Sequence, residues 1–302
     1  MDVGIIGLGR MGLNMARRLA RGGHRVVGYN RTAESTKKAE AEGVVGAYSL
    51  KEMVNKLLSP RVIVIMLPAG RPVDETIEAL KPLLSRNDII VDGGNSFYKD
   101  DLRRFDDLKR SGIGYVDAGV SGGIWGLTEG YCTMIGGERG AFERIEPLLQ
   151  TLAPPGGYLY CGKPGAGHFV KMVHNGIEYG MMEAYAEGFE LLKASPYGDG
   201  IKNSEIACLW NNGSVVRSWL LELLQGAFKK EDGLESVIGY VEDSGEGRWM
   251  VKEAVDMGVA MPVITESLMR RFRSRQDESF AEKVLAAMRE EFGGHSVRRT
   301  RG

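Results

Sequence analysis

The sequence predicts an α/β fold, in which an N-terminal Rossmann-type domain with a doubly wound, mainly parallel sheet precedes an all-α domain. Short apolar runs alternate with longer amphipathic segments in the first half of the chain, as in β-α-β units with buried parallel strands. A GxGxxG motif follows the first run. Beyond about residue 160, strand patterns nearly cease and helical periodicity takes over.

These patterns divide the chain into three expected regions. Residues 1–162 should form the dinucleotide-binding domain, 163–292 an all-helical domain for substrate binding and dimerisation, and 293–302 a Gly-rich, basic tail. We expect strands at 3–7, 25–29, 61–67, 88–94 and 114–120, and one further short run at YLYCG. We expect helices in the second region at 167–194, 203–225, 232–242, 246–257, 263–274 and 278–291.

Composition excludes several classes of protein. The 39 basic and 40 acidic side chains nearly cancel, so no global field points to nucleic acid or a membrane surface as partner. The three cysteines show no CxxC spacing and only four histidines are present, so neither a disulfide framework nor a zinc site is indicated. No run approaches the roughly 18 apolar residues of a membrane span, and no secretory signal is recognisable. We expect a cytoplasmic protein.

The glycine motif GLGRMG places Gly7, Gly9 and Gly12 after a predicted strand and at the start of a predicted helix. In dinucleotide-binding turns the first glycine permits the tight turn, the second lets the backbone approach the pyrophosphate, and the third allows close helix–strand packing. The next strand ends at Asn30, Arg31 and Thr32.

That second strand end favours NADP as the cofactor. An acidic residue there would bind the ribose 2′-hydroxyl of NAD, whereas an arginine can pair with the 2′-phosphate of NADP. NAD remains open if Arg31 is only a solvated residue at the start of a helix. The residues expected to bind the cofactor are Gly7, Leu8, Gly9, Arg10, Met11, Gly12, Asn30, Arg31, Thr32, Leu67, Pro68, Ala69 and Asn95.

Two further strand ends carry candidate ligand-binding groups. Asn95 follows the paired glycines of DGGNS (92–96), and Ser121, Gly122 and Gly123 follow the strand ending at 120. Ligands bind at the carboxyl ends of strands in open α/β sheets, and such turns offer amide, hydroxyl and free N–H groups. The alternatives are an asparagine helix cap and a purely structural turn.

The segment GHFVKMVHNGIEYGMM (167–182) places Lys171, His174, Asn175 and Glu178 on one helix face, where the apolar stripe of a core helix normally lies. An internal ion-pair network is one explanation. Beside a dinucleotide domain we favour catalysis, because buried charges must be paired or meet a ligand. A lysine whose pKa is lowered by burial can deprotonate a substrate hydroxyl, and a protonated carboxylic acid can return a proton later; Lys171 and Glu178 suit those roles.

Together GLGRMG, NRT (30–32), DGGNS, GVSGG (119–123) and above all KMVHNGIEYG (171–180) resemble the decarboxylating 6-phosphogluconate dehydrogenase family, within the β-hydroxyacid dehydrogenase superfamily. The resemblance covers nearly the whole chain. It implies metal-free, NADP- or NAD-dependent oxidation of 6-phosphogluconate to ribulose 5-phosphate and CO2 in the pentose phosphate pathway.

The resemblance also implies roles for individual residues. Lys171 would be the base and later the acid, Glu178 would protonate C1, and Asn175 would assist them. The substrate would be held by Asn95, Ser121, Gly122, Gly123, His174, Asn175, Tyr179, Arg248 and Arg271, and by Arg289 and His295 of a neighbouring subunit's RxxFGGH element. We therefore expect a homodimer or homotetramer whose C-terminal tail completes a neighbouring active site.

The chain departs from the family pattern in three places. It is much shorter than the common long form, and therefore resembles the short form with one helical unit. GRWM (247–250) replaces a GKWT-like stretch, which weakens the expectation for Arg248, and Ile124 and Trp125 replace an acidic pair. The competing hypotheses are a dehydrogenase for a small unphosphorylated 3-hydroxy acid, which would not need the cationic set, and a non-catalytic cofactor sensor, which would not need Lys171 with Glu178.

Overall fold

The structure, a computed structural model, describes residues 1–299 apart from the side chain of Phe292. The chain separates into two compact units, one spanning Met1–His174 and one beginning at Asn175. This division falls inside helix α8 (Ala166–Ala194), a continuous helix of 29 residues. The domain boundaries expected at 162 and 292 rest on sequence patterns and stay predictions.

The first unit is built on one eight-stranded sheet with the strand order β3-β2-β1-β4-β5-β6-β7-β8. All neighbouring strands are parallel except β6 and β7. The strands are β1 (Asp2–Ile6), β2 (Arg25–Tyr29), β3 (Val45–Ala47), β4 (Val62–Ile65), β5 (Ile89–Asp92), β6 (Gly114–Ser121), β7 (Cys132–Gly137) and β8 (Tyr158–Gly162). The predicted mainly parallel, doubly wound sheet is confirmed.

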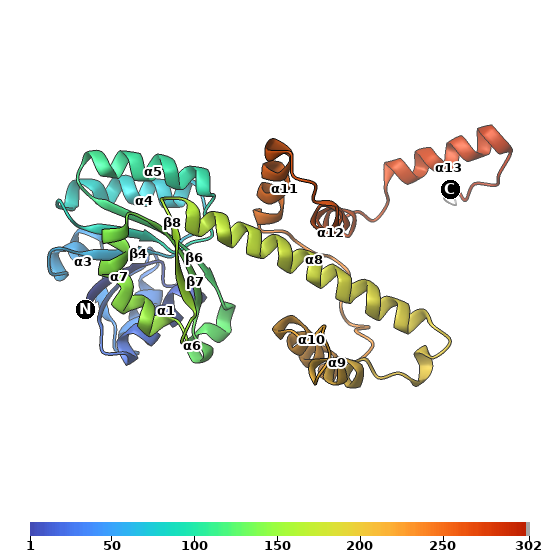
Figure 1. The fold of residues 1–302 in the computed structure, drawn as a ribbon, viewed down its shortest axis with the longest axis horizontal. Helices are drawn as coiled ribbons and strands as arrows, with labels where there is room; N and C mark the ends of the chain where they lie inside the picture. The colour runs from blue at the N-terminus through green and yellow to red at the C-terminus, as the bar shows by residue number, and fades with distance from the viewer. Residues whose placement is uncertain (300–302) are drawn as a thin grey trace. The chain divides into compact units, whose positions relative to one another are not determined.

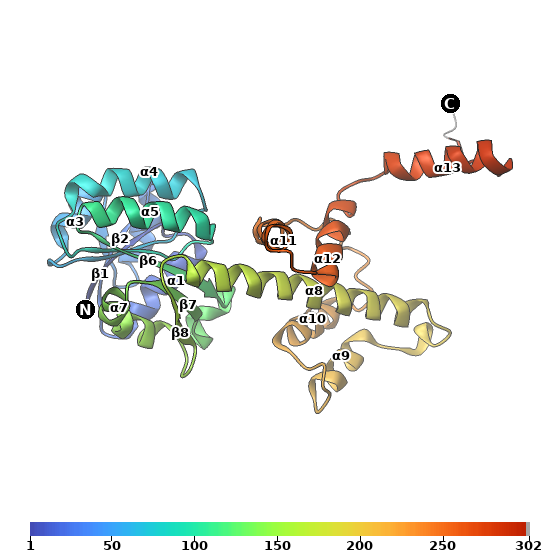
Figure 2. The same ribbon diagram turned by 45° about the horizontal axis from the view of Figure 1, so that its top comes forward.

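Helices cover both faces of this sheet (Figures 1 and 2). On one face α1 (Arg10–Arg21) and α7 (Arg139–Leu152) bury residues such as Leu19 and Leu148, and on the other α3 (Leu50–Lys56), α4 (Arg71–Leu80) and α5 (Tyr98–Arg110) bury residues such as Ile77 and Leu108. Each such aliphatic side chain contributes about 1.5–3 kcal/mol on burial. The remaining helical elements of the unit are α2 (Ala33–Glu40), η1 (Lys81–Leu83), η2 (Gly123–Trp125) and α6 (Gly126–Glu129).

The second unit contains no strand among its described residues, which confirms the expected all-α region. After α8 follow η3 (Gly198–Gly200), α9 (Asn203–Asn211), α10 (Trp219–Lys230), α11 (Glu246–Met257), α12 (Pro262–Arg273) and α13 (Phe280–Gly293). A buried cluster in this unit joins Phe189 of α8 to Ala207 of α9 and to Leu221 and Phe228 of α10.

Two expected helices were wrong in detail. The segment 203–225 is divided into α9 and α10, because Gly213 takes a positive φ of 91° and the Ser218 side chain caps α10 by accepting from the Leu221 amide. The segment 232–242 contains no helix. It includes two glycines and the β-branched pair Val237 and Ile238, which disfavour helix, and Leu234 has a φ of 53°.

Two short strands were not foreseen. β3 is an edge strand of three residues, too short for an alternating pattern to show. β7 ends on two glycines, and it pairs antiparallel with β6. Over residues 1–299 no helix is long and apolar enough to cross a bilayer.

Candidate functional site

The carboxyl ends of the parallel strands bring the predicted ligand-binding loops to one edge of the sheet. The strand order reverses direction between β1 and β4, and such a switch point forms the crevice where ligands bind. One loop, Gly7–Gly12, follows β1, and a second, Asn30–Thr32, directly follows β2. A third, Leu67–Ala69, begins two residues after the last residue of β4. All of the predicted cofactor residues therefore lie in the first unit, and these three loops lie at one edge of its sheet.

The glycine turn has the shape of a pyrophosphate cradle. A Cβ on Gly7, whose φ is 92°, or on Gly12 would collide with backbone oxygens of Met66 and Gly7 respectively. A Cβ on Gly9 would meet nothing within 4 Å, and no side chain caps α1 at this residue. The first and third glycines are required by packing and the second leaves open space at a helix N-terminus, which suits an anionic diphosphate.

The Asn30 side chain stabilises this glycine turn through hydrogen bonds. Its side-chain oxygen accepts a hydrogen bond from the Leu8 amide at 3.0 Å, and its amide group donates to the Thr32 carbonyl at 3.3 Å. Arg31 is exposed beside it. Asn30 therefore joins the ends of β1 and β2, and Arg31 extends from that junction toward solvent.

A buried carboxylate, missed at the sequence level, shapes the loop that carries Asn95. Asp92, fully buried at the end of β5, accepts hydrogen bonds from the Gly94 amide (3.0 Å), the Ser96 hydroxyl (2.7 Å) and Arg104 (3.0 Å). Asn95 lies half-buried at the bend between Gly94 and Ser96. The one sequence feature that could have predicted this buried carboxylate is the aspartate at the end of the apolar run IIVD (89–92).

A second buried aspartate holds the start of helix α8. Asp117, on β6, accepts from the amides of Gly165 (2.7 Å) and His168 (3.0 Å), which otherwise lack partners at a helix N-terminus. A Cβ on Gly167 would lie 2.6 Å from the Asp117 carbonyl oxygen, and one on Gly119 would collide with the Cβ of Lys171. Small residues therefore let α8 approach β6 closely.

This contact places the predicted base beside the SGG turn. Lys171 is buried, with 7% of its surface exposed, although its helix carries exposed apolar residues such as Val170 and Ile177. One turn later, Nε2 of His174 lies 3.4 Å from the Ser121 hydroxyl. The turn continues through Gly122 and Gly123, with φ values of 128° and 52° that favour glycine. The structure thus brings Lys171, His174 and the SGG turn together in the first unit.

In the second unit the same helix continues with Asn175, Glu178 and Tyr179. The Asn175 amide donates to Glu246 of α11 at 3.0 Å, and the Tyr179 hydroxyl accepts from the Ser244 amide at 3.3 Å. Glu178 is half-buried on this face. The predicted polar face is therefore a face of packed, hydrogen-bonded groups rather than a surface of solvated charges.

The predicted cationic residues lie in three places: Arg248 on α11, Arg271 on α12, and Arg289 with His295 at the end of α13. The Arg271 guanidinium lies 3.5 Å from the centre of the Tyr179 ring and lines a pocket with Arg270 and Arg273 of the same helix. Arg289 and His295 are exposed at the end of α13, where the His295 amide donates to the Arg289 carbonyl at 3.4 Å.

Arg248 is already engaged by a carboxylate. It binds Asp243 through two nitrogens at 2.7 and 2.9 Å, and Arg275 binds the same carboxylate at 2.6 Å. Hydrogen bonding to Arg248, and then to Arg275, lowers the pKa of Asp243 to about 2 despite its partial burial. Arg248 is thus held in an ion pair within this unit.

A further buried pair was also missed. Nδ1 of His168 lies 2.7 Å from Asp101, whose other oxygen accepts from the Tyr115 hydroxyl at 2.7 Å. Burial alone would lower the pKa of His168, but the Asp101 charge outweighs burial and raises it to about 10. Burial raises the pKa of Asp101 to about 6, although His168 opposes the shift.

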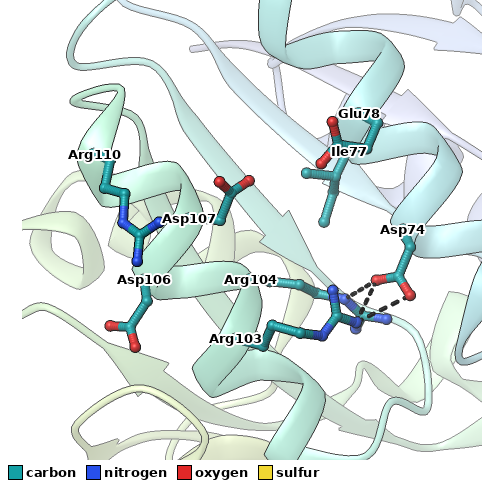
Figure 3. A pocket seen from close by; sticks show the side chains of 8 residues that line it. All are labelled: Asp74, Ile77, Glu78, Arg103, Arg104, Asp106, Asp107 and Arg110. Atoms are coloured by element: carbon teal, nitrogen blue, oxygen red, sulfur yellow. Dashed lines mark hydrogen bonds and ion pairs between the residues drawn. The ribbon is translucent and has the colours of Figure 1, made fainter.

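A groove between α4 and α5 differs from the predicted ligand-binding loops in the side chains that line it (Figure 3). It is lined by side chains of both signs, and Arg103 and Arg104 bind Asp74 across it. All of its lining residues come from these two helices, and none comes from the loops at the carboxyl edge of the sheet. Within the first unit we therefore assign the candidate site to the carboxyl-edge loops and to Lys171 and His174 of α8.

Comparison with known proteins agrees with this geometry. The family model for the NAD binding domain of 6-phosphogluconate dehydrogenase matches residues 2–162, and the model for the C-terminal domain of 6-phosphogluconate dehydrogenase matches residues 167–291. The chain is 46% identical over 297 residues to YqeC of Bacillus subtilis, a relative named for 6-phosphogluconate dehydrogenase, with 98% of this chain and 99% of the relative covered.

Two other relatives differ from each other in chain length and in the cofactor that their names or titles give. The NAD(+)-dependent, decarboxylating 6-phosphogluconate dehydrogenase of Haloferax volcanii is 40% identical over 301 residues, covering 99% of each chain. The Plasmodium falciparum 6-phosphogluconate dehydrogenase, solved with NADP+ and with 6-phosphogluconate, superposes with a TM-score of 0.83 at 30% identity and covers 99% of this chain but 66% of its own. The chain belongs to the 6-phosphogluconate dehydrogenase family.

Proposed function

We propose that the chain catalyses the NAD(P)-dependent oxidative decarboxylation of 6-phosphogluconate to ribulose 5-phosphate and CO2, with Lys171 and Glu178 sharing the proton transfers. The observation that carries this assignment is the burial of Lys171, at 7% exposure, against β6 and next to the His174–Ser121 contact. A buried amine beside a turn with donor groups is arranged for proton transfer rather than for surface solvation.

In this mechanism NADP or NAD supplies the hydride acceptor when it is bound. Neutral Lys171 accepts the proton of the C3 hydroxyl as the hydride leaves C3, which produces a 3-keto acid. The C1 carboxylate then leaves as CO2, its bonding electrons form the enediol, and Lys171 returns its proton to the C3 oxygen. Protonated Glu178 next delivers a proton to the former C2, which becomes C1 of the product, while the hydroxyl on the former C3 gives its proton to Lys171, and the ketone ribulose 5-phosphate results. Removal of either group should cost a factor typical of acid–base catalysis, roughly 10²–10⁴.

The remaining predicted residues bind the substrate in this proposal. Asn95, the Ser121–Gly123 turn, His174 and Asn175 would bind the sugar acid, and Tyr179 with Arg271 would bind the phosphate. Support for the phosphate position comes from the Arg271–Tyr179 stacking, since a guanidinium group suits phosphate. Arg270 and Arg273 line the same pocket but are bound to Glu183 and Glu282. Arg248 would reach phosphate only after exchanging its bond to Asp243.

We propose that NADP is the preferred cofactor. Arg31 is exposed just beyond β2, where a guanidinium can pair with a 2′-phosphate. The Haloferax volcanii relative is named as NAD(+)-dependent and the Plasmodium falciparum structure contains NADP+, so the family accepts either. Steady-state rates with the two cofactors side by side test the preference, and Arg31→Ala should weaken NADP selectively while leaving NAD unchanged.

We further propose a homo-oligomer, a dimer or tetramer, in which Arg289 and His295 complete a neighbouring subunit's site. Helix α13 exposes Phe280, Val284, Leu285 and Met288, and α8 exposes Ile177 and Met181. Apolar side chains at helical spacing are costly to leave in water and suit a symmetric interface. The expected cytoplasmic location and the expected independence from metal stay predictions.

The proposed activity is tested by mixing purified protein with 6-phosphogluconate and each cofactor and following reduced nicotinamide by absorbance. The alternative, oxidation of a small unphosphorylated 3-hydroxy acid, is tested in parallel with 3-hydroxyisobutyrate. The stacked Arg271 favours the phosphorylated substrate, and Arg271→Ala should therefore raise the KM for 6-phosphogluconate far more than it lowers kcat.

A further inference from the structure

His168 and Asp101 form a buried pair that the proposed mechanism does not use. His168 lies in the first turn of α8 with 1% of its surface exposed, and Asp101, on α5, is fully buried. Nδ1 of His168 lies 2.7 Å from Asp101, and Nε2 lies 3.2 Å from the carbonyl oxygen of Gly94. Gly94 immediately precedes Asn95. One imidazole ring therefore connects α8 and α5 to the Asn95 loop.

The partners of the ring define its charge. A carbonyl oxygen can only accept a hydrogen bond, so Nε2 must carry a proton, and an ionised Asp101 likewise accepts from Nδ1. Both ring nitrogens are donors in the imidazolium form alone. The high pKa of His168 agrees with this form, and charge-assisted bonds are shorter and stronger than neutral ones.

The same loop is fixed from its other side. Asp92 accepts from the Gly94 amide and the Ser96 hydroxyl, while His168 binds the Gly94 carbonyl, so both backbone groups of Gly94 have partners. His168 is three residues before Lys171 on α8, and its own amide is held by Asp117. The ring thus sets the distance between two elements that each carry a predicted site residue.

We propose that His168, charged and held by Asp101, is a positioning residue that fixes the Asn95 loop relative to Lys171 in the geometry that hydride transfer requires. This inference rests on the function proposed above for Asn95 and Lys171. The alignment of substrate and nicotinamide is sensitive to small displacements, and a shift of about 1 Å can cost roughly 10²-fold in rate.

Other charged groups surround the His168–Asp101 pair and decide whether it could bind a metal ion or serves as a structural support. Asp92, Asp101 and His168 together offer atoms within 4.8 Å of one another, a grouping that could hold a metal ion. The Arg104 guanidinium, however, lies 3.0 Å from Asp92 and 3.8 Å from Asp101 and already supplies a cation there. Tyr115 donates to Asp101, and Asp117 faces the His168 backbone. The cluster is therefore satisfied internally, as a fixed support should be.

The test compares His168→Gln and the double variant His168→Gln/Asp101→Asn with wild type and with His24→Gln. Removing the imidazolium alone leaves Asp101 as a buried unpaired charge, which destabilises the fold, whereas the double variant keeps the pair neutral. His24 is the matched control, because it also hydrogen-bonds through its ring but contacts Thr151 and the N-terminus.

The measurement is a single-turnover experiment on the full chain with 6-phosphogluconate and excess enzyme–cofactor complex. At saturating enzyme the rate constant reports hydride transfer in the folded, active molecules, whereas circular dichroism measures the folded fraction separately. We expect the rate constant of the double variant to fall roughly 10²-fold, with the cofactor Kd unchanged and His24→Gln at the wild-type rate. An unchanged rate constant, with or without a smaller folded fraction, would overturn the inference. A silent wild type would instead refute the proposed function.

Discussion

Lys171 and Glu178 are ionisable side chains on a helix face that faces packed structure. Lys171 is buried and Glu178 is half-buried, while the apolar Ile177 between them in sequence has 51% of its surface exposed. This reversal of the usual core pattern is expected where local rules yield to function. The polar face could be predicted from periodicity alone, because Lys171, His174, Asn175 and Glu178 recur at helical spacing.

Glu178→Gln tests the second proton transfer. Glutamine keeps the size and hydrogen-bonding capacity of the side chain but cannot donate a proton to C1, so we expect kcat to fall by roughly 10²–10⁴. The substrate KM should change little, because the loss concerns the transition state. Steady-state kinetics checks the rate, and Glu187→Gln, an exposed residue on the same helix, is the control. A wild-type kcat in Glu178→Gln would exclude Glu178 as the acid.

His168 should also make the stability of the fold depend on pH. Its pKa is raised from 6.5 to about 10 in the folded chain, so above pH 6.5 the unfolded chain loses this proton first and the folded chain keeps it. The folded state then binds more protons, and the free energy of unfolding should fall as pH rises from 6.5 toward 10, by at most about 1.4 kcal/mol per pH unit from this group.

Urea unfolding of wild type and His168→Gln/Asp101→Asn between pH 6.5 and 9 measures this dependence. The double variant is used because His168 lowers the pKa of Asp101, which is about 6 in the folded chain, and loss of the imidazolium alone would raise it into this range. The slope should be smaller in the double variant than in wild type. Equal slopes in the two proteins would show that His168 is not protonated in the folded state.

Helix α8 depends on glycine for its position against the sheet. A Cβ on Gly167 would lie 2.6 Å from the Asp117 carbonyl oxygen and 2.7 Å from the Gly136 amide nitrogen, both backbone atoms that cannot move alone. We expect Gly167→Ala to destabilise the fold by about 1–3 kcal/mol, as overpacking does. It should also lower kcat, because α8 carries Lys171.

Gly188→Ala is the matched control for that change. Gly188 lies in the same helix, and a Cβ there would meet nothing within 4 Å, so alanine should stabilise the chain by up to about 1 kcal/mol through helix propensity. Chemical denaturation compares the two variants. Similar stabilities for Gly167→Ala and Gly188→Ala would contradict the close approach of α8 to β6.

The elements of this fold differ in how far sequence predicts them. Strong apolar runs such as RVIVIML predicted buried strands correctly, since buried parallel strands read as continuous hydrophobic segments. The apolar residues of the segment 232–242 fit a helical period, but its glycines and β-branched residues disfavour a helix, and the structure has none there. The network of Asp92, Asp101, Asp117 and His168 could not be assembled from sequence, because four separate elements, β5, α5, β6 and α8, bring it together.

At the scale of the whole molecule, we expect the C-terminal segment to complete the active site of a neighbouring subunit. Deletion of residues 289–302 removes Arg289 and His295, and each lost charge-assisted contact should weaken substrate binding by about 1.5–3 kcal/mol. Because two such contacts are lost, we expect the KM for 6-phosphogluconate to rise at least about a hundredfold, with cofactor affinity unchanged. Deletion of 297–302 keeps both residues and is the control.

Light scattering with the same proteins tests the oligomer itself. Val284→Asp on α13 places a charge among exposed apolar side chains, so it should dissociate the assembly if this face is buried between subunits. If the deletion of 289–302 and Val284→Asp both keep the wild-type molecular mass and the wild-type KM, the proposal that the tail completes a neighbouring active site is wrong.

The most direct measurement is the turnover of 6-phosphogluconate by wild type and Lys171→Ala, followed as reduced nicotinamide with NADP and with NAD. Wild type should reduce the cofactor and release CO2 in equal amounts, while Lys171→Ala should lose activity by a factor of roughly 10²–10⁴ and keep its circular dichroism spectrum. A wild type that is silent with both cofactors, or a folded Lys171→Ala with the wild-type rate, would contradict the assignment of Lys171 as the base of a 6-phosphogluconate dehydrogenase.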